Sequence, residues 1–221
     1  KFAIRELGDG APFAQISGAM NSLMILVLVP ICGALTQNVS AYRMVSVGSL
    51  ISALSVFFLA VPAHWFQPLA DSWLGGFVGY LLRLQGAINP LWIAIFFFVV
   101  LLSVGEALWS PRLYEYSAAI APKGQEASYM ALSLLPYFVA KFTVGLSSGW
   151  LLKWYCPAGD LPNGVHRESS GMMWVIIGLM ALVTPVGTFL FRKHLQLQES
   201  GREPVISKAE AAAEDEEKGH G

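Results

Sequence analysis

Glu106 and Ser110 are the residues whose types and spacing are best suited to chemistry. Residues 84–105 carry no charge, and Glu106 follows them directly. A carboxylate at membrane depth is costly to desolvate, and such acids usually mark a substrate or proton pathway. Glu106 and Ser110 are four residues apart, so they share one face of a helix. A carboxylate with a hydroxyl one turn away can hold an ammonium group or pass on a proton. The alternative is a purely structural Glu near the membrane edge.

Lys141 is the second unusual charge, about midway along the apolar segment 127–152. An unpaired ammonium at that depth costs about 3 kcal/mol or more, so it should find an acid or reach water. Glu106 is the only acid deep in an apolar segment. A Glu106–Lys141 pair sensitive to protonation is therefore expected. The alternatives are an acid outside this sequence or contact with water.

Asn21 is a weaker candidate, near the start of the first apolar segment. It could reach a ligand, although such residues more often make a helix–helix hydrogen bond. The sequence has no Gly-rich phosphate loop and no Cys/His cluster with metal-ligand spacing. No nucleophile with a base is visible at depth, so we expect no cofactor, no metal and no enzyme. Nearly equal numbers of basic and acidic residues, 14 and 15, give no indication of a nucleic-acid partner.

The composition indicates a membrane protein. The chain is 55% hydrophobic and 13% charged, whereas soluble domains typically carry about 25% charged residues. Crossing a bilayer takes about 20 apolar residues. Five segments reach that length: 16–36, 44–62, 91–110 with a break at Ser110-Pro111, 127–152 and 171–191. They are too continuous for barrel strands, so the predicted class is an all-α polytopic membrane bundle.

Local composition predicts how these segments pack. The segment 44–62 is rich in Ser, Gly and Ala, which permits close helix packing. Pro30, Pro136 and Pro185 lie inside segments and should bend them, as gating points or as static kinks. The linker 63–90 is long and aromatic, and is typical of an interfacial segment along the lipid headgroups.

Three short motifs resemble the tenth helix of the proton-dependent oligopeptide transporter family, within the major facilitator superfamily. They are Gly105-Glu106, Ser110-Pro111 and Ala121-Pro122, in that order and at compatible spacing. Upstream, Asn21 followed by Pro30-Ile31-Cys32-Gly33-Ala34 is similar to the family's eighth helix.

The sequence also departs from the family pattern. Ser22 stands where a Pro usually follows the Asn, and Arg112-Leu113-Tyr114 replaces the usual Gly-Leu context after Ser-Pro. The Trp-Phe pair and the Gly-Asn of the eleventh helix are replaced by Ser133-Leu134 and Ala140-Lys141. These changes reshape the side-chain pocket and add a charge, so peptide specificity is less secure than family membership.

The resemblance implies that the five spans are the last five of a twelve-helix fold and that the chain is part of a longer protein. Residues 1–195 would form the C-terminal transmembrane bundle, and 196–221 a disordered cytoplasmic tail. The missing N-terminal helices of the same chain and the lipid bilayer would be its partners, and the cell membrane its location.

The function implied is proton-coupled symport of di- or tripeptides, or of similar zwitterionic solutes, by alternating access. Glu106, Ser110 and Asn21 would bind the peptide amino terminus. Two alternatives remain open. One is a transporter of another solute, such as an organic anion that Lys141 could neutralise. The other is a non-transporting sensor or scaffold.

Overall fold

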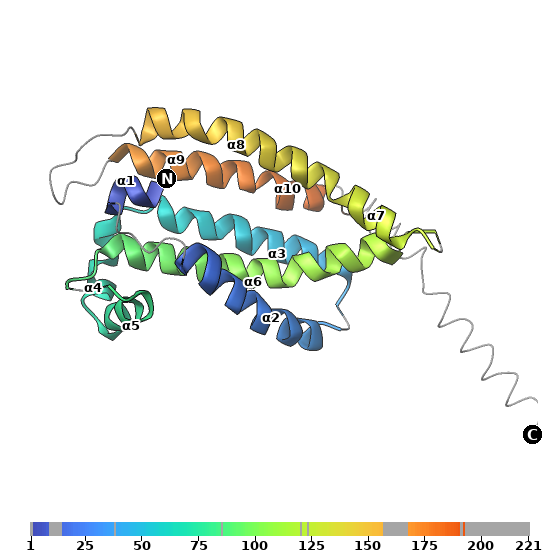
Figure 1. The fold of residues 1–221 in the computed structure, drawn as a ribbon, viewed down its shortest axis with the longest axis horizontal. Helices are drawn as coiled ribbons and strands as arrows, with labels where there is room; N and C mark the ends of the chain where they lie inside the picture. The colour runs from blue at the N-terminus through green and yellow to red at the C-terminus, as the bar shows by residue number, and fades with distance from the viewer. Residues whose placement is uncertain are drawn as a thin grey trace, which may run out of the picture. The chain divides into compact units, whose positions relative to one another are not determined.

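The computed structural model describes residues 2–8, 15–37, 39–84, 86–119, 121–122, 124–156, 168–190 and 192, and within these ranges every regular element is a helix (Figure 1). The α-helices are α1 Phe2–Leu7, α2 Asn21–Leu35, α3 Ala41–Ser55, α4 Gln67–Ala70, α5 Trp73–Leu82, α6 Pro90–Ala119, α7 Glu126–Ser133, α8 Leu135–Tyr155, α9 Glu168–Ala181 and α10 Val183–Leu190. A π-helix, η1 Gln15–Met20, precedes α2, and two 3-10 helices, η2 Val56–Leu59 and η3 Ala63–Phe66, follow α3.

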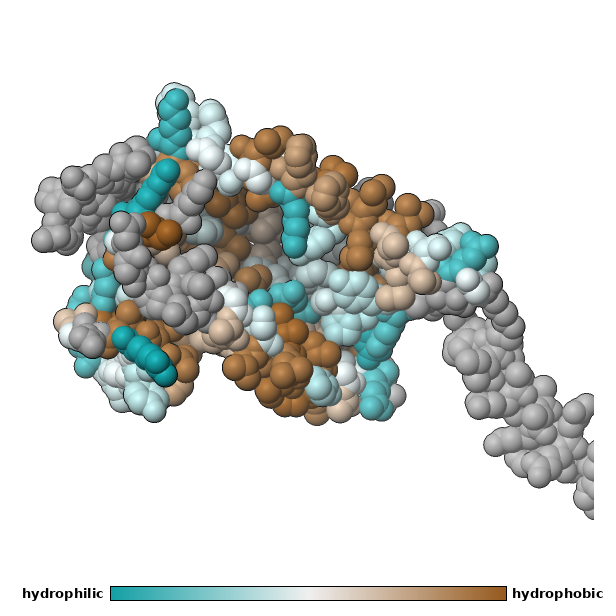
Figure 2. Space-filling model, in the orientation of Figure 1, coloured by the Kyte–Doolittle hydropathy of each residue, from teal (hydrophilic) through white to brown (hydrophobic). Residues whose placement is uncertain are grey.

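Five stretches of helix are long and apolar enough to cross a membrane. They are Gly18–Leu35, Ala41–Leu59, Pro90–Glu115, Ala127–Tyr155 and Ser170–Leu190. These stretches agree with the five predicted spans, and the all-helical class is confirmed for the described residues. Figure 2 shows apolar residues over the visible surfaces of α2 and α8. No residue of α2 is buried, and Leu152 is the one buried residue among the described side chains of α8. Apolar side chains on an outer face are what a lipid-facing helix requires.

The closest packing in the bundle is between α3 and α6, which form its most extensive helix pair. A Cβ added to Gly48 would lie 2.7 Å from the carbonyl oxygen of Gly105 and 2.9 Å from the backbone nitrogen of Trp109. The two backbones are therefore in contact, without side chains between them. This arrangement confirms the close packing predicted from the Ser, Gly and Ala content of the second span.

The predicted break of the third span at Ser110-Pro111 is wrong. Helix α6 continues through Pro111 to Ala119. Proline removes one backbone hydrogen bond, to the carbonyl four residues earlier. One lost bond is tolerated in a membrane helix that its neighbours support. Here α2 and α3 both pack along α6, and the Ser117 hydroxyl donates to the Leu113 carbonyl in the turn after the proline.

The other three prolines differ in their effect. Helix α2 runs through Pro30 without a break. The fourth span is divided at Leu134, with Pro136 in the first turn of α8. The fifth is divided at Leu182, two residues before the Thr-Pro of α10. First-turn N–H groups have no partner within the helix, so proline costs little there.

The aromatic linker after η2 is folded into η3, α4 and α5. Its small and apolar residues form a buried cluster with the start of α6: Ala63, Phe66, Ala70, Val78, Leu82, Leu91 and Trp92. Three of its aromatic residues point outward instead, since Trp65, Trp73 and Tyr80 are exposed by 69%, 81% and 85%. The interfacial role of the linker stays a prediction. The exposure of these three side chains agrees with it, because Trp and Tyr favour the lipid headgroup region.

The N-terminal helix α1 docks against the end of α8. The Arg5 guanidinium donates to the carbonyl of Leu152, at 3.0 Å, and to that of Cys156. Cys156 is the residue that caps the C-terminal end of α8, and the Leu152 carbonyl also accepts from the Cys156 backbone N–H. A cation there also complements the negative end of the helix dipole. Sequence reasoning did not anticipate this helix.

A compact unit of residues Lys1–Pro185 contains every candidate site residue, and a second unit begins at Val186. The predicted boundary at 195/196 and the predicted disordered tail lie outside the described residues. That division of the chain stays a prediction.

Candidate functional site

Glu106 lies about 100° around α6 from Gly105, which packs on α3. Its neighbour Gly105 faces α3, because a Cβ there would lie 2.3 Å from the Ser52 hydroxyl. Successive helical residues are rotated by about 100°, which places Ser103, Glu106 and Ser110 within about 60° of one another. They form a polar stripe on an otherwise apolar stretch of helix. We call these three residues the α6 stripe.

Asn21 on α2 contacts the α6 stripe. The Ser103 hydroxyl lies 2.5 Å from Oδ1 of Asn21 and 2.8 Å from the Val99 carbonyl oxygen. Ser103 is fully buried, and Asn21 is half-buried. Asn21 therefore makes a helix–helix hydrogen bond, the alternative role considered for it, and this bond holds the first turn of α2 beside the stripe.

Ser103 was not among the residues predicted from the sequence. A single Ser in an apolar run is common, because its hydroxyl can bond to the preceding turn of its own helix. The available signal was its spacing, three residues before Glu106 and seven before Ser110. That spacing places it on the same helix face.

Glu106 and Ser110 are both half-buried. Within the part of the chain that the structure describes, the Glu106 carboxylate has no ion-pair partner, since the one ion pair there joins Arg112 and Glu115. A carboxylate oxygen accepts hydrogen bonds readily. A half-buried acid beside two hydroxyls and an amide can therefore accept an ammonium group and orient it.

The structure does not bring Lys141 to Glu106. Lys141 lies exposed on α8, with Nζ 4.4 Å from the centre of the Tyr137 ring on the preceding turn. Helix α8 packs against α9 and follows α7, while α6 packs against α2 and α3. The expected Glu106–Lys141 pair is thus not formed in this structure, and the ammonium makes a cation–π contact instead.

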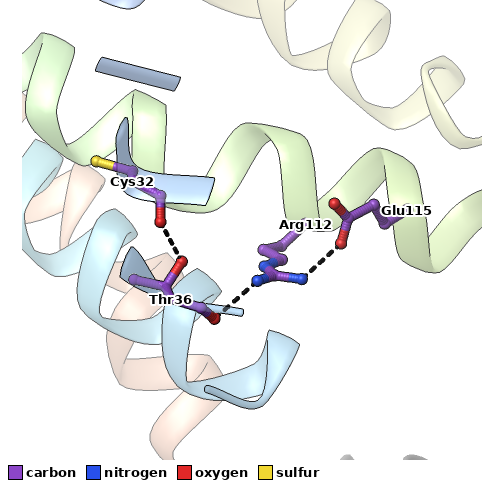
Figure 3. A network of polar contacts seen from close by, with 4 residues as sticks. All are labelled: Cys32, Thr36, Arg112 and Glu115. Carbon is purple, nitrogen blue, oxygen red and sulfur yellow. Dashed lines mark hydrogen bonds and ion pairs between the residues drawn. The ribbon is translucent and has the colours of Figure 1, made fainter. Parts of the chain in front are cut away.

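A second polar link joins α2 to α6, beyond the stripe (Figure 3). Arg112 donates through Nη2 to the Thr36 carbonyl at 2.8 Å and through Nη1 to Glu115 at 2.8 Å. The Thr36 hydroxyl in turn donates to the Cys32 carbonyl at 2.5 Å. Arg112 therefore provides a partner for a carbonyl at the C-terminal end of α2.

The two links lie on either side of Glu106 along α6. Ser103 precedes it by three residues, and Arg112 follows it by six. They hold opposite ends of α2, one at Asn21 and the other at Thr36. The position of α2 beside the acid is therefore fixed at both ends, and α2 packs against α6 between them.

No group of three or more His, Cys, Asp or Glu side chains that could hold a metal occurs among the described residues. Comparisons of the chain with family models, with curated proteins and with solved structures find no match. The functional argument therefore rests on the geometry of the site and on the motifs in the sequence.

Proposed function

We propose that this chain is the C-terminal part of a proton-coupled symporter of small peptides or similar zwitterionic solutes, on a major facilitator fold. The observation that carries the proposal is the half-buried Glu106, placed on one face of α6 with Ser110 and with Ser103, which binds Asn21. An acid without an ion-pair partner among the described residues has a cost that a transport site explains.

In this proposal the Glu106 carboxylate receives the ammonium group of the solute. Ser110 and Asn21 supply hydrogen bonds that orient it. In a symporter the proton and the solute cross together, so the response of Glu106 to protonation would link its pairing with the ammonium to the proton carried with the solute. Alternating access then moves two helical bundles around the site, as in secondary transporters generally. The chain would lie in the cell membrane with its C-terminus in the cytoplasm.

The two links from α2 to α6 suit such a mechanism. A transporter must keep its binding residues in register while whole bundles rock. Because Asn21 and Thr36 are both fastened to α6, α2 and α6 would move as one body. The solute-binding groups would then stay together while their access to either side changes.

Replacement of Glu106 by Gln tests the proposal, in the full-length protein reconstituted into liposomes. The change keeps the shape of the side chain and removes its charge. Uptake of a dipeptide driven by an inward proton gradient should fall to background in E106Q. Glu115→Gln is the matched control, since Glu115 is an exposed acid on the same helix, and it should retain uptake. Undiminished accumulation by E106Q would refute the proposed role.

An organic anion is the second candidate solute, and the environment of Lys141 favours it. Its ammonium is exposed and, among the described residues, is paired with no acid. A cation in that condition can neutralise a carboxylate solute. Lys141→Gln should then abolish uptake of the anion, whereas it should leave uptake of a dipeptide bound through Glu106 largely intact.

A further inference from the structure

A cavity of about 400 Å³ lies between α1, the segment joining η2 to η3, and the first turns of α6 and α9. Part of its lining comes from the small residues Ala60, Ala63 and Gly171, and their lack of bulk creates the hollow. Phe2, Leu59 and Leu91 supply large apolar surfaces. The volume is within the range of small-molecule sites, which is roughly 300–1,000 Å³.

Glu6 gives the cavity its charge. Its nearest basic neighbour in sequence, Arg5, is engaged elsewhere, because its guanidinium donates to the carbonyls of Leu152 and Cys156. One Glu6 oxygen accepts a weak contact from the Cys156 thiol at 3.4 Å. Among the described residues Glu6 forms no ion pair. The cavity therefore presents a half-buried carboxylate that forms an ion pair with no cation among the described residues.

The chemistry of the lining selects among possible ligands. A carboxylate repels an anion, and the apolar walls do not replace the water shell of a hard metal ion. Calcium would need about six to eight oxygen ligands, whereas the polar side chains here are Glu6, His64 and Ser170. An ammonium group can pair with Glu6 while an attached hydrocarbon covers Phe2 and Leu91.

We propose that this cavity binds a small organic ammonium compound, with its amine at Glu6 and its apolar body against Phe2, Leu59 and Leu91. The site is separate from Glu106 and does not depend on the proposed transport function. Leu91 and Glu106 are 15 positions apart in the sequence, which corresponds to about 22 Å along the α6 axis. A ligand of this size cannot contact both.

The test uses 2-phenylethylamine, which is positively charged at pH 7, with the full chain in lipid nanodiscs and titration calorimetry. Neutral 2-phenylethanol and anionic 3-phenylpropanoate have the same apolar body but no positive charge. Their heat signals therefore measure partition into the lipid without pairing to Glu6. Glu6→Gln removes the charge, and Ala60→Leu fills the cavity while leaving Glu6 in place. Asp71→Asn is the control, since Asp71 is an acid of the aromatic linker that does not line the cavity and is in contact with Gln67.

Saturable binding of the amine is expected, about tenfold weaker or more in E6Q, a factor that corresponds to 1.4 kcal/mol. A60L should also lose binding, whereas D71N should bind as the wild type does. Equal binding of 2-phenylethanol would overturn the proposal, because it would show partition alone. Unchanged binding by both E6Q and A60L, or loss of binding in E106Q alone, would overturn it as well. The last result would place the amine at Glu106 and leave the transport proposal standing.

Discussion

Gly105 and Gly48 meet backbone to backbone where α6 crosses α3. A Cβ on Gly105 would lie 2.6 Å from the carbonyl oxygen of Gly48, a separation that real side chains do not adopt. Gly105 is also the residue immediately before the candidate functional acid. Its hydrogen side chain therefore has a structural role: it lets α3 support α6 from behind while Glu106 projects from another face.

Replacing Gly105 by Ala should destabilise the bundle. The new methyl group would lie 2.3 Å from the Ser52 hydroxyl and 2.8 Å from its backbone nitrogen, so the helices must move apart. Overpacking of this kind costs about 1–3 kcal/mol. Unfolding titrations in mixed micelles should show the loss. Gly145→Ala on α8 is the control, because a Cβ there meets nothing within 4 Å, and it should stabilise by about 0.5–1 kcal/mol through helix propensity. Equal effects of both changes would contradict this account of the crossing.

Arg112 should hold the C-terminal end of α2 against α6. Arg112→Gln removes the 2.8 Å hydrogen bond to the Thr36 carbonyl and should increase hydrogen exchange in the turn after α2. The rest of the bundle should remain protected. The exchange is measured by mass spectrometry on peptides that cover residues 30–43.

Glu115→Gln distinguishes the contributions of the two bonds of Arg112, because it removes the bond to Glu115 and leaves the bond to the Thr36 carbonyl. It removes the ion pair with an acid that is 61% exposed, and such surface pairs contribute only about 0–1 kcal/mol. Exchange after α2 should therefore stay near the wild-type level. If E115Q opened this turn as much as R112Q does, the ion pair rather than the Thr36 contact would hold it.

Arg5 should fasten α1 to the end of α8. Arg5→Gln shortens the reach to the carbonyls of Leu152 and Cys156 and should expose α1 to proteolysis. A hydrogen bond from a charged donor contributes about 1.5–3 kcal/mol. Lys153→Gln is the matched control. Lys153 is a cation of α8 itself, in its last turn, and its side chain is exposed. Limited proteolysis should distinguish the two variants, and equal cleavage would contradict the role of Arg5.

The spans could be predicted because bilayer thickness fixes their length and lipid excludes unpaired backbone. Close packing of α3 could be predicted because its small residues lie close together in the sequence and permit two helices to approach. The break at Pro111 was wrong because proline propensity is also local, whereas the support that α2 and α3 give to α6 is not. The helix α1 was missed because six residues carry too little periodicity to identify a helix.

The site residues likewise divide into those whose placement follows from local geometry and those whose placement depends on contacts distant in sequence. The shared face of Glu106 and Ser110 follows from helix geometry alone. The partners of Asn21 and Arg112 do not, because they are 82 and 76 residues away in sequence. The pair of Glu106 with Lys141 was expected from depth along each span. Depth does not say which helices are neighbours, and α8 packs against α9 in this structure.

The contact of Asn21 with Ser103 should contribute measurable coupling energy. Hydrogen bonds between membrane helices average about 0.6 kcal/mol and reach about 1.7 kcal/mol. The Asn21–Ser103 bond should fall in the upper part of that range, because Ser103 is fully buried and water cannot replace its partner. A double-mutant cycle of N21A and S103A in unfolding titrations measures this coupling.

Ser110→Ala provides the contrast within the same stripe. Ser110 is half-buried and, within the described part of the chain, bonds to no other helix, so S110A should leave stability within about 0.5 kcal/mol of the wild type. If Ser110 binds solute as proposed, S110A should nevertheless weaken uptake. Ser103 would then act through the position of α2, and Ser110 through the solute itself. A coupling energy near zero between Asn21 and Ser103 would remove the structural basis for placing Asn21 in the site.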